Sequence, residues 1–408
     1  GDNNVAVGYA ALYTEDGHGH GKNVAVGKNA LYSLNAGADG LNTAVGFEAG
    51  VLLSTGVSNT LIGSRNGDAL TTGNYNVAVG DEALGSDTQG SNSVAIGVGS
   101  LLNQNLTSAT AVYNTAVGHA AGNQVTTGTH NTLMGGKVGD AITTGGYNTA
   151  VGYDALTANT TASENSAFGA FALAANTTGT YNVAIGKSAM EANTTSSYNT
   201  VVGVTALDAA TTGGYNTAVG YNCLGNVTTG WSNNGFGNGA LAALTTGADN
   251  HAFGTNALGA LTTTNGSIGI GHYAGIYATG IQNTVIGHVA GYANNGANKL
   301  TTGSYNVLLG SYANLNATGD IYNVVIGHAA TGKGSTTGII APSNGAMYQG
   351  NNSSSWTTTS DQRLKKNIAD IWWKSLKTSD VKIYPIDTSI IQSTEVWKAS
   401  GHLAEFTD

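Results

Sequence analysis

One stretch of the sequence decides the fold: Gly146-Tyr-Asn-Thr-Ala-Val-Gly-Tyr-Asp-Ala-Leu-Thr-Ala-Asn-Thr-Thr-Ala162. Close copies of it recur along most of the chain, and we count about nineteen. In the most regular part, the glycine after the Ala-Val step recurs every 17 residues, at Gly118, Gly135, Gly152, Gly169, Gly186, Gly203, Gly220, Gly237, Gly254 and Gly271. A fixed period of this length predicts stacked structural repeats and not a globular enzyme.

The first half of each unit predicts a short β-strand that ends at the glycine. In the copy at 77–79, the period of two places Val77 and Val79 on one side and Ala78 on the other. We expect stacking to bury the valine side, and the alanine side to lie close to another backbone. The glycine permits a left-handed corner. The following Ala-Leu should direct its leucine into the coil, and Thr-Thr-Gly should close the coil with a turn.

These features predict an all-β fold, a repetitive parallel β-roll or β-solenoid of about nineteen coils with a 17-residue period. Coils that stack about 4.8 Å apart would form a rod of roughly 90 Å. The strands are short and the segments between them lack a helical period, which excludes TIM-barrel and Rossmann enzymes. We expect the repeat shaft over residues 1–338 and a connector over 339–359.

The composition excludes several classes of function. Charged residues make up only 9% of the chain and the net charge is −9, without a basic stripe, so we expect no nucleic-acid partner. No apolar run approaches 18 residues, so we expect no membrane insertion. The sequence opens within a repeat and shows no signal peptide, so we expect export to depend on other elements or on cell lysis.

Three polar rows of the repeat are candidates for function. The threonine pairs could form an ice-binding face, although neighbouring copies vary at Ala162 and Ser196. The asparagine before each strand should form a structural ladder through Asn148, Asn165, Asn182, Asn199 and Asn216. A tyrosine row could bind glycans by stacking or only cover the coil edge, at Tyr147, Tyr181, Tyr198, Tyr215 and Tyr305.

Histidines and the one cysteine raise the question of metal or thiol chemistry. A row of histidines on a three-fold axis could bind a metal, and four follow strand glycines: His119, His272, His288 and His328. The same position holds Lys28, Asp81 or Asn238 elsewhere, so we predict exposed side chains, no metal site and no cofactor. Cys223 replaces the alanine of neighbouring copies and should be a small buried filler.

The unit resembles the head repeats of trimeric autotransporter adhesins, a left-handed parallel β-roll. Their motif Asn-Ser-Val-Ala-Ile-Gly stands at residues 92–97, and most other copies read Tyr-Asn-(Val/Thr)-Ala-(Val/Ile)-Gly. The resemblance covers about residues 1–338 and implies a homotrimer, which would suit the side of the strand that carries only alanine. The longer 17-residue unit with its Thr-Thr-Gly turn departs from that family's pattern.

The repeat stops after Gly338, and a different motif begins at Ser360-Asp-Gln-Arg-Leu-Lys-Lys-Asn-Ile368. Its apolar spacing predicts a short helix over 360–371, a helical start to the C-terminal tail. The motif resembles the endosialidase-type intramolecular chaperone of phage tail spikes and fibres, which opens with Ser-Asp-x-Arg-x-Lys, trimerises the fibre and cuts itself off. That resemblance implies catalytic roles for Ser360, the nucleophile on the Thr359 carbonyl, and Lys365, its base. A plain helix cap and a solvated lysine are the alternative.

Residues 372–408 resemble a fragment of the catalytic domain of class II glycyl-tRNA synthetases. The matching stretches are Trp-Trp-Lys from Trp372 and Val-Trp-x-Ala-Ser-Gly-His from Val396. That family also has Leu-Lys-x-Asn-Ile before its Trp-Trp, so residues 364–371 fit either family. About 37 residues cannot form a synthetase site, so Ser400 and His402 are only a motif fragment. We expect a chimera formed by misassembly of environmental DNA, and a natural fusion is the alternative.

Together these features predict a structural and adhesive protein, a phage tail fibre or appendage shaft that attaches to a host surface. Its expected partners are two further copies of the chain and a host cell-surface receptor or glycan, bound multivalently. We expect it in the virion, or at a cell surface or outside the cell. The head of a bacterial trimeric autotransporter adhesin is the main alternative, and an ice-binding solenoid and a synthetase fragment are minor ones. Autocleavage before Ser360 is the only enzymatic step that we predict.

Overall fold

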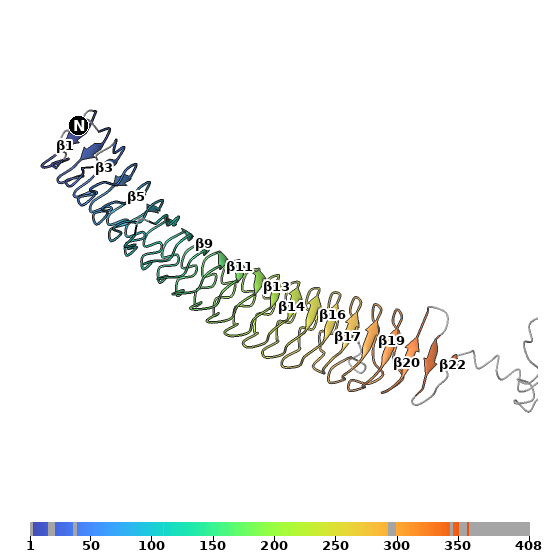
Figure 1. Cartoon of the computed structure of the whole chain (residues 1–408). Coiled ribbons are helices and arrows are strands. Elements are labelled where there is room, and N and C mark those ends of the chain that lie inside the picture. Colours follow the sequence, from blue (N-terminus) through green and yellow to red (C-terminus); the bar gives the residue numbers. More distant parts are fainter. Residues whose placement is uncertain are drawn as a thin grey trace, which may run out of the picture. The chain divides into compact units, whose positions relative to one another are not determined.

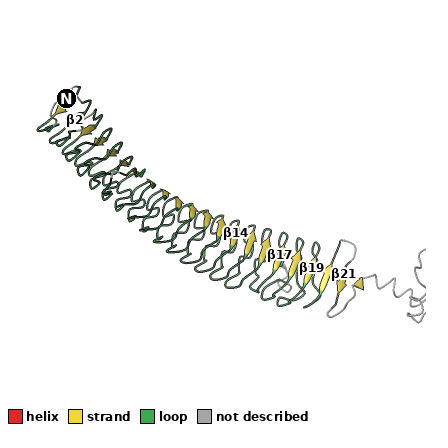
Figure 2. Ribbon diagram, in the orientation of Figure 1, coloured by secondary structure: helices red, strands yellow, loops and turns green. Residues whose placement is uncertain are grey.

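The computed structural model describes residues 3–14, 21–35, 39–108, 110–292, 299–342, 346–350 and 357–358. The chain divides into two compact units, 1–358 and 359–408. In the first unit, short strands stack in a parallel β-solenoid of about nineteen coils (Figure 1). The described residues contain no helix, and strands alternate with turns and loops as Figure 2 shows. The predicted fold class is therefore confirmed.

Each coil contributes one three-residue strand to a single long sheet. The parallel strands are β1 (Val5–Val7), β2 (Val24–Val26), β3 (Thr43–Val45), β4 (Thr60–Ile62), β5 (Val77–Val79), β6 (Val94–Ile96), β7 (Thr115–Val117), β8 (Thr132–Met134), β9 (Thr149–Val151), β10 (Ser166–Phe168), β11 (Val183–Ile185), β12 (Thr200–Val202), β13 (Thr217–Val219), β14 (Asn234–Phe236), β15 (His251–Phe253), β16 (Ile268–Ile270), β17 (Thr284–Ile286), β18 (Val307–Leu309), β19 (Val324–Ile326) and β20 (Gly338–Ile340).

The strands pair in register, so equivalent residues of successive repeats face one another. Thr149, Ala150 and Val151 of β9 pair with Ser166, Ala167 and Phe168 of β10, for example. Equal side chains therefore form rows along the solenoid, one row for each position of the repeat. This arrangement explains why a sequence so poor in charge can fold, because the next coil satisfies the backbone of each coil.

The corners of each coil depend on left-handed backbone, as the sequence predicted at the strand glycine. Gly152 has a φ of 137°, and a Cβ there would lie 2.6 Å from the carbonyl carbon of Gly169. The same coil holds Tyr147, Asp154 and Leu156 at φ values of 58°, 53° and 52°. Each of these three residues donates its backbone N–H to a carbonyl of an adjacent coil. These hydrogen bonds between adjacent coils offset the strain of the left-handed conformation.

The interior of the coil is narrow, and it corrects one prediction. The middle residue of β2 to β20, such as Ala78, is buried, while Val77 and Val79 beside it remain partly exposed on the outer face. Stacking thus buries the alanine side and not the valine side. Alanine is favoured because its side chain points into a core that the leucine of the same coil, for example Leu84, already fills. The alanine side therefore cannot face a neighbouring chain.

Where one core position of a coil carries a larger side chain than usual, another core position carries a smaller one. Leu133 replaces the usual alanine in β8, and the position that elsewhere holds the core leucine is then Gly139. A Cβ on Gly139 would lie 3.0 Å from Leu133 Cδ2, and one on Gly122 of the preceding coil 2.8 Å from Leu133 Cδ1. Such dense packing leaves no room for a large residue at both positions.

The expected connector over 339–359 contains strands. β20 still pairs with β19 in the parallel direction. β21 (Met347–Gln349) and β22 (Thr357–Thr358) then pair antiparallel and end the sheet. Tyr348 packs against the core, and this contact stabilises the antiparallel strand β21. The predicted helix over 360–371 and the synthetase-like fragment over 372–408 lie outside the described residues.

Candidate functional site

The asparagine ladder is structural, as predicted. Asn148 is buried. Its side-chain amide group donates hydrogen bonds to Asn131 Oδ1 at 3.1 Å and to the Ala162 carbonyl at 2.9 Å. Its own Oδ1 accepts the backbone N–H of Asn165 at 3.1 Å. The ladder continues along the solenoid, with serine in place of asparagine at Ser93 and Ser267. These amides have little hydrogen-bonding capacity left for a ligand.

The threonine pairs split into two rows with different roles. The first threonine is half-buried, and its hydroxyl donates to the carbonyl of the equivalent threonine in the next coil, at 3.1 Å from Thr143 to Thr160. The second threonine is exposed in nine successive coils: Thr127, Thr144, Thr161, Thr178, Thr195, Thr212, Thr229, Thr246 and Thr263. Only this second row presents free hydroxyl surface along one edge.

The tyrosine row forms a stack of rings along another edge. The rings of Tyr181, Tyr198 and Tyr215 follow one another at centroid distances of 5.1 Å and interplanar angles of 6° and 8°. Tyr147 stacks on His130 at 4.6 Å, and Tyr305 on Tyr322 at 4.8 Å. The rings are exposed, and each has a parallel ring on at least one face, with Tyr198 stacked on both faces. The row therefore offers ring edges and hydroxyl groups, which is a poor surface for stacking a sugar.

The four predicted histidines are exposed, as their variable position indicated. The His272 and His288 rings stack at 5.3 Å with an interplanar angle of 10°. Among the residues that the structure describes, no group of three or more His, Cys, Asp or Glu side chains could hold a metal ion. Metal binding on a three-fold axis would need partner chains.

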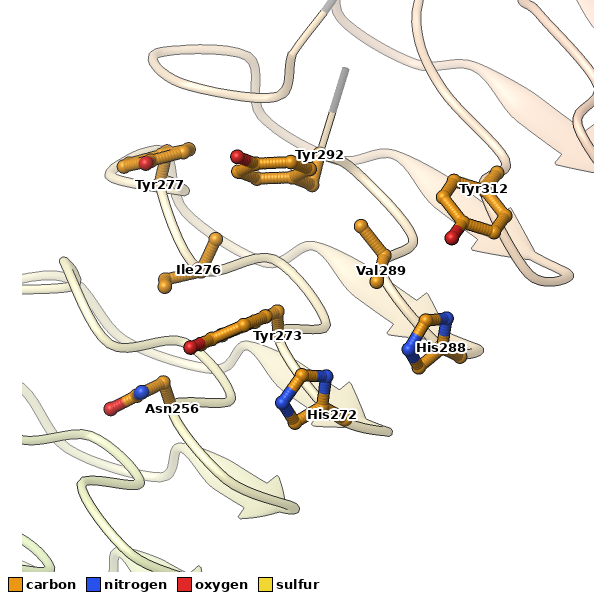
Figure 3. Close-up of a pocket in the computed structure, with 9 residues that line it drawn as sticks. All are labelled: Asn256, His272, Tyr273, Ile276, Tyr277, His288, Val289, Tyr292 and Tyr312. Carbon is orange, nitrogen blue, oxygen red and sulfur yellow. The ribbon is translucent and has the colours of Figure 1, made fainter. Parts of the chain in front are cut away.

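A hollow lies where the repeat is irregular, and the sequence did not predict it. β16 and β17 begin 16 residues apart and β17 and β18 begin 23 apart, in place of the usual 17. The resulting cavity of about 410 Å³ is lined by Asn256, His272, Tyr273, Ile276, Tyr277, His288, Val289, Tyr292 and Tyr312. Figure 3 shows Ile276 and Val289 between a Tyr277–Tyr292 pair and a His272–His288 pair. The signal was available, because Ile-Tyr replaces the Thr-Ala that follows Ala-Leu in the quoted repeat.

The outer face of the sheet carries the most extended apolar surface. We call the third residues of β1 to β19 the outer apolar row. All are apolar: Val7, Val26, Val45, Ile62, Val79, Ile96, Val117, Met134, Val151, Phe168, Ile185, Val202, Val219, Phe236, Phe253, Ile270, Ile286, Leu309 and Ile326. Several are about 40% exposed, among them Ile62, Ile185 and Phe253.

Cys223 is fully buried beside the core, which confirms its predicted role as a filler. Burial raises the pKa of its thiol to about 12. A Cβ on Gly235 of the next coil would lie 2.5 Å from the sulfur, so glycine there makes room for it. The thiol is therefore unsuited to nucleophilic chemistry.

Ser360 and Lys365, the predicted cleavage residues, and Thr359 before them lie outside the described residues. Their proposed roles remain predictions. No helix in the described part of the chain has the length and hydrophobicity that crossing a bilayer requires.

Comparison with known proteins finds similarity to one class of enzyme over a small part of the chain. No protein-family model matches the sequence. The glycine–tRNA ligase of Nocardia farcinica is 39% identical over 71 residues, which are 17% of this chain and 15% of the ligase. That of Chlorobaculum tepidum is 47% identical over 45 residues, 11% and 10% of the two chains. The chain therefore spans only about a tenth to a seventh of these relatives, and the match is to a fragment, as the sequence indicated.

Proposed function

We propose that this chain is the shaft of a trimeric adhesive fibre, a phage tail fibre or appendage that attaches to a host cell surface. The observation that carries the proposal is the outer apolar row. It contains no charged or polar residue in nineteen successive strands. Soluble monomers rarely expose a contiguous apolar patch larger than a few hundred Å², whereas this row extends for roughly 90 Å at about 4.8 Å per strand.

Further copies of the same chain are the partner that best fits this row. A partner must be apolar and as long as the solenoid, must follow its curvature (Figure 1), and must repeat at the spacing of one coil. Another copy of the row meets all these conditions. Three copies that each present the row to a common axis would cover it without leaving an open edge for further growth. The row thus takes the role that the sequence analysis assigned to the alanine side.

Attachment would then depend on the surfaces that remain outside the trimer. Three shafts multiply each weak contact with a receptor or glycan, and the combined binding can exceed that of one contact by about 10² to 10⁴. The low charge of the shaft also suits contact with uncharged polysaccharide, because neither partner must lose strongly bound counterions.

Mass measurement of the purified full chain tests the proposal. Light scattering should give three times the mass of one chain. The variant Phe168→Lys/Ile185→Lys places two charges in the outer apolar row and should give monomers. Thr178→Lys/Thr195→Lys adds the same charges to the exposed threonine row of the same coils and should leave the trimer intact. A monomeric parent chain would contradict the trimer.

The C-terminal proposal is autocleavage between Thr359 and Ser360. Mass spectrometry should show two fragments divided at this bond, and Ser360→Ala or Lys365→Ala should give the intact chain. Intact parent protein would remove the chaperone from the proposal.

A glycine–tRNA ligase match of 45 residues is longer than residues 372–408, so it must include residues outside that range. Sequencing the source DNA beyond codon 340 distinguishes a chimera from a natural fusion.

An ice-binding solenoid is a second candidate, and the exposed threonine row favours it. Nine exposed threonines in successive coils give a regular array. The first threonine row, in contrast, uses its hydroxyls within the protein. Thermal hysteresis of the purified chain would support ice binding, and freezing without hysteresis would reject it. The adhesin-head alternative shares the trimer and differs only in how the chain is exported and anchored.

A further inference from the structure

We propose that the hollow beside β16 and β17 binds a neutral pyranose of a surface glycan. The inference deepens the proposed adhesive function and rests on it for its biological setting. The described lining residues are all on one chain, so sugar binding can be measured whether or not the chain forms a trimer. We call it the aromatic groove.

The aromatic groove differs from the tyrosine row in what its rings expose. In the row, Tyr198 has a near-parallel tyrosine on each side. In the groove, Tyr273 meets His272 at 48°, and Tyr312 meets His288 at 71° and His328 at 90°. No parallel ring stacks on Tyr273 or Tyr312 among the described residues. Tyr273 is partly exposed and Tyr312 is 36% exposed, and we place the apolar C–H face of the pyranose on the ring surface that these tilted and edge-on neighbours leave uncovered.

The shape of the groove fits a small rigid ligand. Its volume of about 410 Å³ lies in the lower part of the usual range for small-molecule sites. The two walls in Figure 3 are the Tyr277–Tyr292 pair, with centroids 5.5 Å apart, and the His272–His288 pair. Ile276 and Val289 between them give an apolar floor. Because the two rings of each pair stack on one another, the walls present ring edges to a ligand, and ring stacking would depend on Tyr273 and Tyr312.

The polar groups of the groove suit hydroxyl groups. The lining offers tyrosine hydroxyls, histidine ring nitrogens and the amide of Asn256, which can each donate or accept a hydrogen bond. None of the described lining residues is an aspartate, glutamate, lysine or arginine. Lys299 lies beside the lining, with Nζ 4.6 Å from the Tyr277 ring centroid, where the ring interacts with it. The chemistry therefore favours an uncharged ligand over a sialic acid or a phosphate.

The irregular repeat gives these residues their positions. Tyr273 occupies the left-handed corner position with a φ of 57°, where a regular coil has Asp154 at 53°. A glycine at 275 replaces the core leucine, and a Cβ there would lie 2.9 Å from Leu258 Cδ2. Ile276 and Tyr277 then follow on the outside of the coil. The asparagine ladder continues past this point, since Asn306 Nδ2 donates to Asn283 Oδ1 at 3.1 Å, so the groove rests on an intact stack.

Saturation-transfer NMR on the full chain tests the site with a defined panel of sugars. The panel holds lactose, cellobiose and N,N′-diacetylchitobiose as neutral probes and sialyllactose as the acidic probe. We expect transfer to at least one neutral sugar. Tyr273→Ser and Tyr312→Ser should each weaken its binding by about tenfold, the effect of losing one stacking face. Tyr198→Ser is the matched control, because Tyr198 is also an exposed left-handed tyrosine, and it should bind as the parent does.

Several outcomes would overturn the inference. Transfer to none of the neutral sugars would reject it, and so would loss of binding in Tyr198→Ser with retention in Tyr273→Ser. Transfer to sialyllactose alone, lost in Lys299→Ala, would show an acidic ligand class. Circular dichroism checks that each variant folds. Because Tyr273 and Tyr312 lie in different coils, the test can still be made if one of the two variants fails to fold. Mass measurement on the same samples separates this test from that of the fibre: a trimer that binds no sugar contradicts only the groove.

Discussion

The regular coils of β7 to β15 and the irregular coils of β16 to β18 share one scaffold but differ in their outer loops. Both keep the strand pairing, the glycine corner and the asparagine ladder. Only the second region changes its coil length and replaces small polar residues with aromatic ones. In the regular coils equivalent positions line up in rows along the solenoid. In the irregular coils the rows are interrupted, and a cavity opens.

This difference indicates which parts of the coil can vary. The sheet side is fixed by contacts that join backbone to backbone, and these leave little freedom. The loops away from the sheet are also joined by backbone hydrogen bonds between coils, for example from Leu156 N–H to the Ala172 carbonyl, but their length varies while the strands before and after them still pair. A repeat protein can thus acquire a binding site at one coil while the rest remains a shaft.

The largest expected effect concerns the glycine corner, which should be equally sensitive in both regions. Gly135→Ala places a Cβ 2.4 Å from the Gly152 oxygen, and Gly287→Ala places one 2.5 Å from the Gly310 oxygen. With φ values of 144° and 136°, each should cost about 4 kcal/mol or more, or prevent folding. Thermal unfolding followed by circular dichroism measures the loss.

The neighbouring glycine is the control for this prediction. A Cβ on Gly136 would be 3.6 Å from Tyr153 Cδ2, an ordinary contact, so Gly136→Ala should change stability by less than about 0.5 kcal/mol. If Gly135→Ala were as stable as Gly136→Ala, the corner would not be what holds the coils in register.

The asparagine ladder should give the next largest effect. Asn148→Ala removes three hydrogen bonds, which join its side chain to the Asn165 N–H, the Ala162 carbonyl and Asn131 Oδ1. The Ala162 carbonyl keeps its bond from Asn159 Nδ2, and Asn131 Oδ1 keeps its bond from the backbone N–H of residue 148. The Asn165 N–H is left buried and unpaired, and this penalty together with the lost bonds should cost about 2–4 kcal/mol. Urea unfolding measures the loss, and Asn283→Ala in the irregular region should match it, because the ladder spans both.

Serine at the same position provides a graded control. Ser267 occupies the ladder in β16's coil, and its hydroxyl accepts the Asn283 N–H at 3.3 Å. Asn148→Ser should therefore lose clearly less than Asn148→Ala. Equal losses would mean that the acceptor of the ladder contributes nothing.

A smaller loss of stability is expected at Leu133 and Gly139, and the effects of changing these two core residues should depend on each other. Leu133→Ala should cost about 2–4 kcal/mol through the cavity it leaves, and Gly139→Leu about 1–3 kcal/mol through overpacking. The double variant recreates the usual Ala and Leu pair, and the φ of Gly139, 54°, matches that of Leu156, 52°. The double variant should lose at least about 1 kcal/mol less stability than the sum of the losses in the two single variants. Gly122 would remain as a residual void, so recovery should be partial, and strict additivity would contradict the exchange.

The fold could be predicted well from the sequence because each position of the repeat occurs about nineteen times in the chain, so its preferred residue type is clear. The glycine corner, the inward leucine and the ladder of asparagines each follow from a residue type that recurs in one place. The direction of the strand faces did not follow, because alternation alone cannot say which side is interior. Alanine marked the interior since Leu84 and its equivalents fill the narrow core from the other side. The aromatic groove was missed because averaging over repeats hides the departures at Tyr273 and Tyr277.

The smallest expected effect concerns Cys223, whose thiol has a pKa raised by burial to about 12. Ellman's reagent at pH 8 should leave the folded chain unmodified and label it fully in guanidinium chloride. Because the unfolded thiol loses its proton near its ordinary value of about 9 and the folded one does not, this group lowers stability as pH rises from about 9 toward 12. Cys223→Ala should lack that slope and cost less than about 1 kcal/mol at pH 7. Gly235→Ala, which collides with the sulfur in the parent chain, should be tolerated in the Cys223→Ala background. Failure of that rescue would show that the backbone of β14, and not the sulfur, requires the glycine.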